Sequence, residues 1–189
     1  QIFDDLNFKR LKKDHWNLLS FIRKLSNPEK EIDVIWVNGN HDEDLSEIMS
    51  HLIGIDVYEE YIWNENEKIY LAIHGHQFDR FLNENVVVSN VASFVYDKMQ
   101  RISPQKQIIP RFVKRASKSW LRLSHKVADG AIEYAKSKNA DFVFCGHTHQ
   151  TLSKEIDGVK YYNSGCWTDI PSSMITINNL GEIEIVNID

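Results

Sequence analysis

The fold is decided by the stretch FVFCGHTH at residues 142–149. Its first four residues are mostly apolar, which predicts a buried strand, and Gly146 then allows the backbone to turn sharply. His147 and His149 are two positions apart, so in an extended loop both imidazoles project to the same side. Neutral imidazoles at a strand end are suitable ligands for a metal. Alone this signal is weak, because two nearby histidines often occur by chance.

The same pattern of an apolar run, a glycine and metal-type residues occurs at two other places. Residues 32–37 (IDVIWV) lead into NGNHD at 38–42, and residues 69–73 (IYLAI) lead into HGH at 74–76. In open α/β sheets, ligands bind beyond the carboxyl ends of the strands. The three polar clusters therefore predict one site at one edge of a sheet.

The whole chain of 189 residues predicts a single α/β domain over 1–189, with antiparallel strands at its end and a helical insertion over about 79–139. It has ordinary apolar (42%) and charged (26%) fractions and no apolar run of about 18 residues, so we expect no membrane-spanning helix. Hydrophobic periodicity and turn residues predict helices at 6–25, 45–52, 86–99, 112–123 and 127–138, and further strands at 57–63, 68–73, 151–156, 159–162, 173–177 and 182–186.

The chain contains only two cysteines, Cys145 and Cys166. Two cysteines do not make a disulfide framework, so a reducing compartment is the default and we expect a cytoplasmic protein. Both fall near strand ends and could be neighbours in space. Buried free thiols are the favoured interpretation.

Basic residues are concentrated in one block from Lys98 to Lys126, which has nine Lys or Arg and no Asp or Glu although the chain carries −5 overall. Such a segregated block indicates an anionic partner. Large apolar residues are interleaved with the charges, which suits peripheral contact with a lipid surface. The alternative is a solvated basic helix packed on the core.

Mixed nitrogen and oxygen ligands favour Mn, Fe, Zn or Co over a cysteine-bound structural zinc. Two such metals about 3.5–4 Å apart can clamp a phosphate oxygen and deprotonate a bridging water at neutral pH. His41, next to Asp42, could protonate a leaving alkoxide or stabilise charge on the phosphoryl group. The alternative for His41 and His74 is that they are ordinary loop histidines with no part in a site. His76 either supports a metal ligand or has no role in the site.

The order GNHD at 39–42, HGH at 74–76 and GHTH at 146–149 resembles that of the calcineurin-like metallophosphoesterases. The resemblance implies a four-layer α/β/β/α sandwich with two divalent metal ions, Mn foremost and Fe, Zn or Co as alternatives. It also assigns roles by motif: Asn40, His74 and His147 to one metal, His149 to the other, and His41 with Asp42 to the leaving group and the phosphate.

Within this family, three features resemble the UDP-2,3-diacylglucosamine pyrophosphohydrolase-like branch: Phe78-Asp79 after HGH, the helical insertion, and YNSGCW at 162–167. This implies a lipid-linked UDP-sugar substrate, with the insertion as a lid over the acyl chains and residues 98–126 against the inner membrane. Two positions depart from that branch, because His41 stands where its enzymes typically have arginine and Cys166 where they have aspartate.

The family's first motif, DxH, is absent, and its GDxxD motif survives only as QIFD at 1–4, with Gln1 where the bridging aspartate would fall. We expect the first strand and the first metal motif to precede Gln1. The leading hypothesis is a phosphoester or pyrophosphate hydrolase acting on a phosphorylated small molecule or a lipid-linked substrate. The alternatives are a non-catalytic binding module on the same fold and a phosphodiesterase for nucleic acid, which we rank lower because the basic block contains large aliphatic residues.

Overall fold

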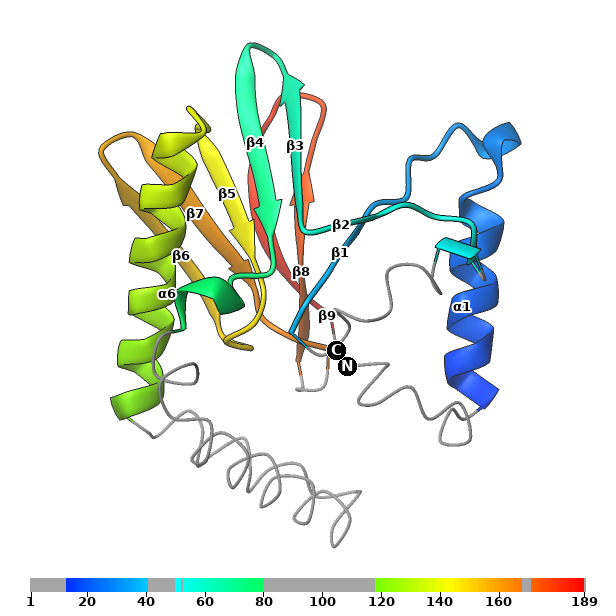
Figure 1. The fold of residues 1–189 in the computed structure, drawn as a ribbon, viewed down its shortest axis with the longest axis horizontal. Coiled ribbons are helices and arrows are strands. Elements are labelled where there is room, and N and C mark those ends of the chain that lie inside the picture. Colours follow the sequence, from blue (N-terminus) through cyan, green and yellow to red (C-terminus); the bar gives the residue numbers. More distant parts are fainter. Residues whose placement is uncertain (1–12, 41–49, 52, 80–117, 168–170, 189) are drawn as a thin grey trace, which may run out of the picture.

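The computed structural model describes residues 13–40, 50, 51, 53–79, 118–167 and 171–188. Its longer helices lie on two sides of the molecule, with the sheets between them (Figure 1). In chain order the elements are α1 (Lys13–Leu25), the 3-10 helix η2 (Pro28–Lys30), β1 (Trp36–Val37), β2 (Val57–Tyr58), β3 (Glu60–Glu65), β4 (Lys68–Ile73), the 3-10 helix η4 (His76–Phe78), α6 (Lys118–Ser137), β5 (Phe142–Cys145), β6 (Thr151–Ile156), β7 (Val159–Ser164), β8 (Ser172–Ile177) and β9 (Ile183–Ile188).

A five-stranded sheet in the order β3-β4-β5-β7-β6 forms the centre of the fold (Figure 1). Strands β4, β5 and β7 are parallel to one another. At the two edges of the sheet, β3 pairs antiparallel with β4 and β6 pairs antiparallel with β7. The carboxyl ends of β4, β5 and β7 therefore meet at one edge of the sheet. Both histidine motifs, HGH and GHTH, follow directly at that edge.

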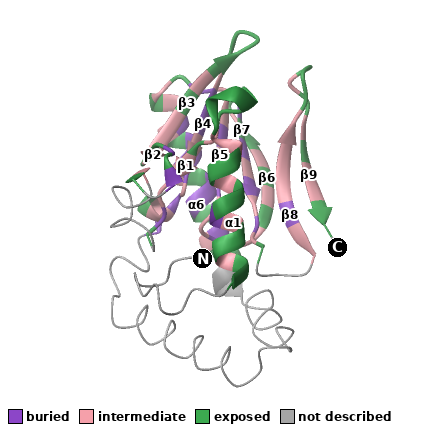
Figure 2. Ribbon diagram, turned by 90° about the vertical axis from the view of Figure 1, so that its right-hand side faces the viewer, coloured by how far each residue is buried: buried purple, intermediate pink, exposed green. Residues whose placement is uncertain are grey.

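One face of this sheet is covered by α6. Leu71 and Ile73 of β4 and Val143 of β5 are buried on this face, in one cluster with Ala128 and Ile132 of α6. Figure 2 shows the buried residues gathered where α6 meets the sheet. Burial of a full aliphatic side chain contributes roughly 1.5–3 kcal/mol, so this contact is a main source of the stability of the strand ends.

The other face of the sheet carries a row of stacked aromatic rings. Tyr70 packs on Trp63 and Phe142, with ring centroids 5.1 and 4.8 Å apart, and Phe144 continues the row to Tyr162. Cross-strand aromatic pairs of this kind stabilise neighbouring strands. They help to hold β4 and β5, the two strands that are followed by the histidine motifs, in register.

Two smaller sheets complete the architecture. Strands β1 and β2 pair in parallel, and β8 and β9 pair antiparallel. Helix α1 packs on the first of these through Leu19, which is buried in a cluster with Ile53 and Ile55. With α1 and α6 on opposite sides and strands between them, the predicted α/β architecture is confirmed (Figure 1).

Several predicted boundaries were wrong. The predicted strand at 32–37 is regular only at Trp36–Val37, and the predicted strand at 57–63 is interrupted at Glu59. The interruption has a topological cause, because β2 pairs with β1 whereas β3 pairs with β4, so the chain crosses between sheets there. Strand β7 continues to Ser164, two residues further than predicted, since Asn163 pairs with Cys145.

The predicted helices at 112–123 and 127–138 meet as one helix, α6, from Lys118 to Ser137. Ser124 and Val127 are both buried and lie three positions apart, so the buried stripe continues through the expected break. Residues 112–117, the predicted helix at 86–99 and most of the helix at 45–52 lie outside the described residues. Among the described helices, none has the length and apolarity needed to span a membrane.

Glu60 at the start of β3 ties this edge strand to α6. Its carboxylate accepts hydrogen bonds of 2.6 Å from both Lys138 Nζ and Tyr134 OH. The bond from Lys138 and then the bond from Tyr134 lower the pKa of Glu60 below its ordinary value. A carboxyl group with a lowered folded-state pKa stabilises the fold above its unfolded pKa, and this contribution is lost as the pH falls through the folded pKa.

Replacing Glu60 with Gln is therefore expected to lower the free energy of unfolding by about 1 kcal/mol at neutral pH. The difference from the unmutated protein should be smaller at about pH 3, because the charge of Glu60 is lost as the pH falls through its folded-state pKa. Urea unfolding at the two pH values measures this, with Glu184→Gln on the exposed face of β9 as the control. An equal difference at both pH values would contradict the ionic role of Glu60.

Candidate metal centre

His74 follows the last residue of β4, and the chain then turns into η4 at Gly75, whose φ is +100°. A Cβ on Gly75 would lie 3.3 Å from Val127 of α6 and 3.5 Å from Cys145 of β5, so both conformation and space favour glycine here. The turn brings His76 back beside His74, with 3.2 Å between the two Nδ1 atoms. His76, which the sequence left as a supporting residue or a bystander, is a direct neighbour of a predicted ligand.

His147 follows β5 on the adjacent strand. The amide of Gly146 donates to the carbonyl of His74 at 3.1 Å, so the two strand ends are joined by a backbone hydrogen bond. The imidazole centroids of His74 and His147 are 5.1 Å apart, and those of His76 and His147 are 6.3 Å apart. The structure thus brings together two of the four predicted metal ligands, from segments more than seventy positions apart in the chain.

Asp79 is a site residue that the sequence reasoning missed. It was noted only as part of Phe78-Asp79 after HGH, yet its side chain is 1% exposed and its Oδ2 lies 3.0 Å from Nε2 of His147. Phe78 anchors this segment on α6 at Gly130, where an added Cβ would lie only 2.8 Å from the phenyl ring. The close approach of η4 to α6 therefore places Asp79 beside the histidines.

Asn163 in β7 is a second residue whose role the sequence did not reveal. It is fully buried, and its Nδ2 contacts the carbonyl of Gly146 and lies 3.2 Å from Thr148 Oγ1. Its Oδ1 accepts a 3.0 Å hydrogen bond from the amide of Gly165. One amide side chain thereby joins the loop that carries His147 to the loop that follows β7.

The cysteines take no part in a disulfide, as expected: both are free thiols. Cys145 is buried beneath the histidine loop beside Gly75, and burial raises the pKa of its thiol. A buried neutral thiol acts as a small apolar packing group. Cys166 is partly buried in the loop after β7.

The other predicted site residues are not tested. Asn40 lies in an exposed turn beyond β1, and His149 is partly buried with a φ of +55°. Their approach to His74 and His147 stays a prediction. His41 and Asp42 lie outside the described residues.

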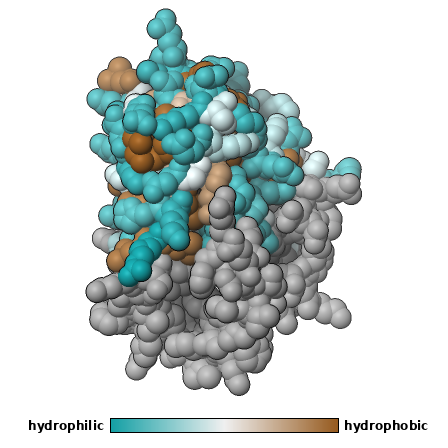
Figure 3. Space-filling view, turned by 60° about the vertical axis from the view of Figure 1, so that its left-hand side comes forward, coloured by the Kyte–Doolittle hydropathy of each residue, from teal (hydrophilic) through white to brown (hydrophobic). Residues whose placement is uncertain are grey.

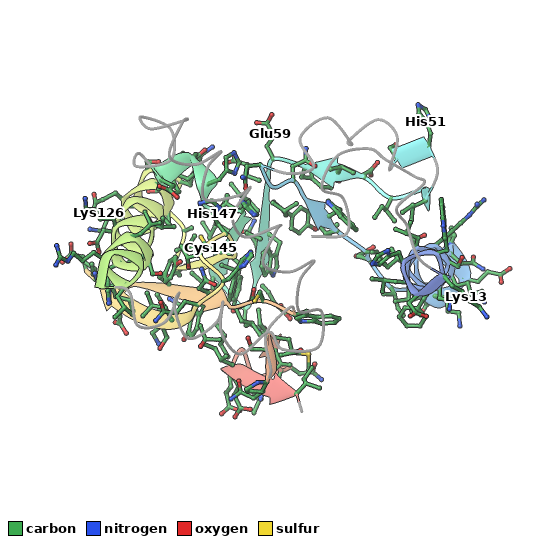
Figure 4. The ribbon with its side chains drawn as sticks, turned by 90° about the horizontal axis from the view of Figure 1, so that it is seen from below. Lys13, His51, Glu59, Lys126, Cys145 and His147 are labelled. Atoms are coloured by element: carbon green, nitrogen blue, oxygen red, sulfur yellow. The ribbon has the colours of Figure 1, made fainter. Side chains whose placement is uncertain are left out.

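The described part of the basic block is the first half of α6. Arg122 and Lys126 are exposed there, and Lys126 lies on the side of the helix away from the sheet (Figure 4). His147 and Cys145 lie inside, where α6 and the strands meet (Figure 4). The surface seen from the α6 side is largely hydrophilic, with scattered apolar groups (Figure 3).

The histidine pair has the spacing that a shared metal requires. Two imidazoles bound to one metal at about 2.1 Å from each ligating nitrogen have ring centres roughly 5 Å apart, and the rings of His74 and His147 are 5.1 Å apart. Within the described ranges, however, no three His, Cys, Asp or Glu side chains are arranged to hold one ion together. The separation of these two rings is therefore compatible with ligation of one ion, and the assignment of Asn40 as a further ligand stays a prediction.

Comparison with solved structures gives several distant likenesses. An archaeal phosphodiesterase is 14% identical, with 91% of this chain and 76% of that chain covered and a TM-score of 0.47. Vps29 from Entamoeba histolytica, complexed with Zn²⁺, is 17% identical; the match covers 94% of this chain and 76% of that chain, with a TM-score of 0.41. A predicted phosphoesterase from Streptococcus pneumoniae is 14% identical; the match covers 90% of this chain and 76% of that chain, with a TM-score of 0.37.

A search of curated proteins gives no significant match. The profile of the calcineurin-like phosphoesterase superfamily domain, in contrast, matches residues 17–177. That range includes the GNHD, HGH and GHTH motifs and most of the chain. The chain therefore belongs to the calcineurin-like phosphoesterase superfamily.

Proposed function

We propose that the protein is a metal-dependent hydrolase of phosphoester or pyrophosphate bonds. The observation that carries this proposal is the pairing of His74 with His147 at two adjacent strand ends, 5.1 Å between ring centres, with His76 and the buried Asp79 against them. A purely structural pair of histidines would not require two further titratable side chains directed at their ring nitrogens. This arrangement is typical of metal-ligating histidines, whose second nitrogen is held by a neighbour.

The proposed cofactor is a pair of divalent cations, Mn foremost, with Asn40, His74 and His147 on one ion and His149 on the other. When bound, such ions polarise a phosphoryl oxygen and lower the pKa of a coordinated water. The protein's own contribution is to hold the imidazoles in fixed orientations from a rigid sheet edge. His41, beside Asp42, is proposed to donate a proton to the leaving oxygen.

For the substrate, we propose an anionic lipid-linked or UDP-sugar-linked phosphate ester. Exposed cations on α6, Arg122 and Lys126, support an anionic partner and contact with an anionic membrane surface. Trp167 supports a substrate with a planar or apolar portion. It follows β7 at the edge where the histidines lie, is 68% exposed, and has its indole N–H fixed by a 3.0 Å hydrogen bond to the carbonyl of Ser173.

Loading the chelator-treated full-length protein with Mn²⁺ is expected to produce hydrolysis of bis(p-nitrophenyl) phosphate, and EDTA should remove this activity. Turnover measured with and without EDTA, together with elemental analysis, tests the proposal. Two metals per chain with EDTA-sensitive turnover support a hydrolase. One metal or none, without turnover, would contradict it and favour a binding module on the same fold.

The substrate proposal has its own test in the same preparation. Hydrolysis of UDP-2,3-diacylglucosamine in mixed micelles is compared with hydrolysis of a single-stranded oligonucleotide at low and high salt. Preferential release of UMP from the lipid-linked substrate supports the proposal. Salt-sensitive cleavage of the oligonucleotide instead would favour the nuclease alternative, since contacts with a phosphate backbone weaken steeply with salt.

A further inference from the structure

We propose that Trp167 is a specificity-determining residue, on which a planar aromatic ring joined to the phosphate of the substrate stacks. This role rests on the proposed function, because the phosphate has to bind at the sheet edge that carries His74 and His147. It deepens that function by naming the part of the substrate that is recognised and the side chain that recognises it.

Trp167 is unusually exposed for its residue type. Tryptophan side chains are on average highly buried in folded proteins, yet that of Trp167 is 68% exposed. Its indole N–H nevertheless donates a 3.0 Å hydrogen bond to the carbonyl of Ser173. Because this N–H is the only hydrogen-bond donor of the side chain, the contact that the indole can still offer to a ligand is stacking on its face.

The loop that carries Trp167 is held in place by the protein itself. Gly165, two positions earlier, has a φ of +72°, and a Cβ there would lie 2.9 Å from Cγ2 of Thr151. The hydroxyl of Ser173, a residue only 4% exposed, donates to the carbonyl of Ser164 at 2.6 Å. Ser173 therefore bonds to the loop through both its hydroxyl and its carbonyl. An aromatic ring fixed in this way loses little freedom when a ligand binds.

Trp167 lies at the same edge of the sheet as the histidine motifs. Cys145 of β5 pairs with Asn163 of β7 in parallel register, so the loops after the two strands leave the sheet side by side. The side chain of Asn163 joins these loops, because it contacts the carbonyl of Gly146 and accepts from the amide of Gly165. Two residues span at most about 7 Å, which keeps the backbone of Trp167 close to this junction. A group attached to a phosphate at the histidines is therefore placed to reach the indole.

The surroundings favour a planar ring over an acyl chain as the group that contacts Trp167. The side chains that hold its loop, those of Asn163 and Ser173, are polar. An acyl chain gains affinity in proportion to the apolar area that covers it, and these side chains do not supply such an area. A planar ring instead stacks on a single indole and keeps its polar edges in water, as nucleobases do on exposed aromatic residues.

The test compares uridine 5′-monophosphate with ribose 5-phosphate, which carries the same phosphate and sugar but no base. In calorimetric titrations of the full-length protein in Mn²⁺, the nucleotide should bind at least about fivefold more tightly, the lower end of what one base–aromatic stack supplies. The nucleotide should also quench the fluorescence of Trp167. Because the chain has five tryptophans, this signal is measured as the difference between the unmutated protein and Trp167→Phe.

Trp167→Phe and Trp167→Leu are the matched variants, because both lose the indole hydrogen bond and differ in whether a planar ring remains. We expect the preference for the nucleotide to persist in Trp167→Phe and to disappear in Trp167→Leu. Trp16→Leu, which removes a tryptophan of α1 that is 44% exposed, is the control and should change neither affinity.

Equal affinities of the two ligands for the unmutated protein would overturn the role of Trp167. An unchanged preference in Trp167→Leu would also overturn it, since a general apolar contact would then suffice. Hydrolysis of bis(p-nitrophenyl) phosphate without a preference for the nucleotide removes this role and leaves the proposed function standing. A preference that depends on the ring of residue 167, in a protein without turnover, supports the role of Trp167 and contradicts the hydrolase.

Discussion

His147→Ala is expected to lower the Mn²⁺-dependent hydrolysis of bis(p-nitrophenyl) phosphate by more than about 100-fold. Loss of a residue that merely supports a metal ligand typically costs 10–100-fold, and removal of a ligand itself should exceed that. His147 is the residue on which the site converges, because it contacts Asp79 and lies against both His74 and His76. Steady-state turnover of the Mn-loaded proteins measures the effect.

The control for this substitution is His125→Ala, which removes an exposed imidazole from α6 and should leave turnover unchanged. Adding His74→Ala to His147→Ala should cause little further loss, since residues that act as one unit have non-additive effects. Full turnover in His147→Ala would remove this residue from the active site.

Asn163→Ala should be the most destabilising of the substitutions considered, with an expected loss of about 3 kcal/mol or more in the free energy of unfolding. The reason is that each buried polar group left without a partner costs roughly 1–3 kcal/mol. Asn163 bonds to groups in both loops, including Thr148 Oγ1 and the amide of Gly165. For a chain of this size the melting temperature should fall by about 10 °C.

Asn187→Ala is the matched control, because this asparagine also lies in a strand but is exposed on β9. Its effect should stay within about 0.5 kcal/mol. Thermal unfolding followed by circular dichroism compares the three proteins. A melting temperature of Asn163→Ala equal to that of the control would show that the amide network does not stabilise the loop of His147.

The sequence was sufficient to predict which sheet edge carries the polar motifs and that His74 and His147 lie close together there. Residues 69–73 and 142–145 are apolar runs that end at a glycine-containing histidine motif, and parallel strands bring such ends together. Periodicity also located β4, β6 and β8 to within a residue. These features depend on local pattern and on one topological rule, both of which can be read from a single chain.

The supporting residues could not be found in this way. Asp79 and Asn163 act through contacts with His147 and its loop that form between separate elements of the fold. No periodicity marks such residues, and an aspartate after HGH or an asparagine at a strand end has many ordinary explanations. The break at Glu59 was missed for a related reason, because strand propensity does not reveal that a chain changes sheets.

The most direct test of the proposed metal site is an anomalous diffraction map from crystals of the full chain soaked in Mn²⁺. Our interpretation predicts a peak within about 2.5 Å of a ring nitrogen of both His74 and His147, the distance range expected for metal–imidazole bonds. A Mn²⁺ peak elsewhere, or histidine rings turned away from each other in the soaked crystal, would contradict the central claim.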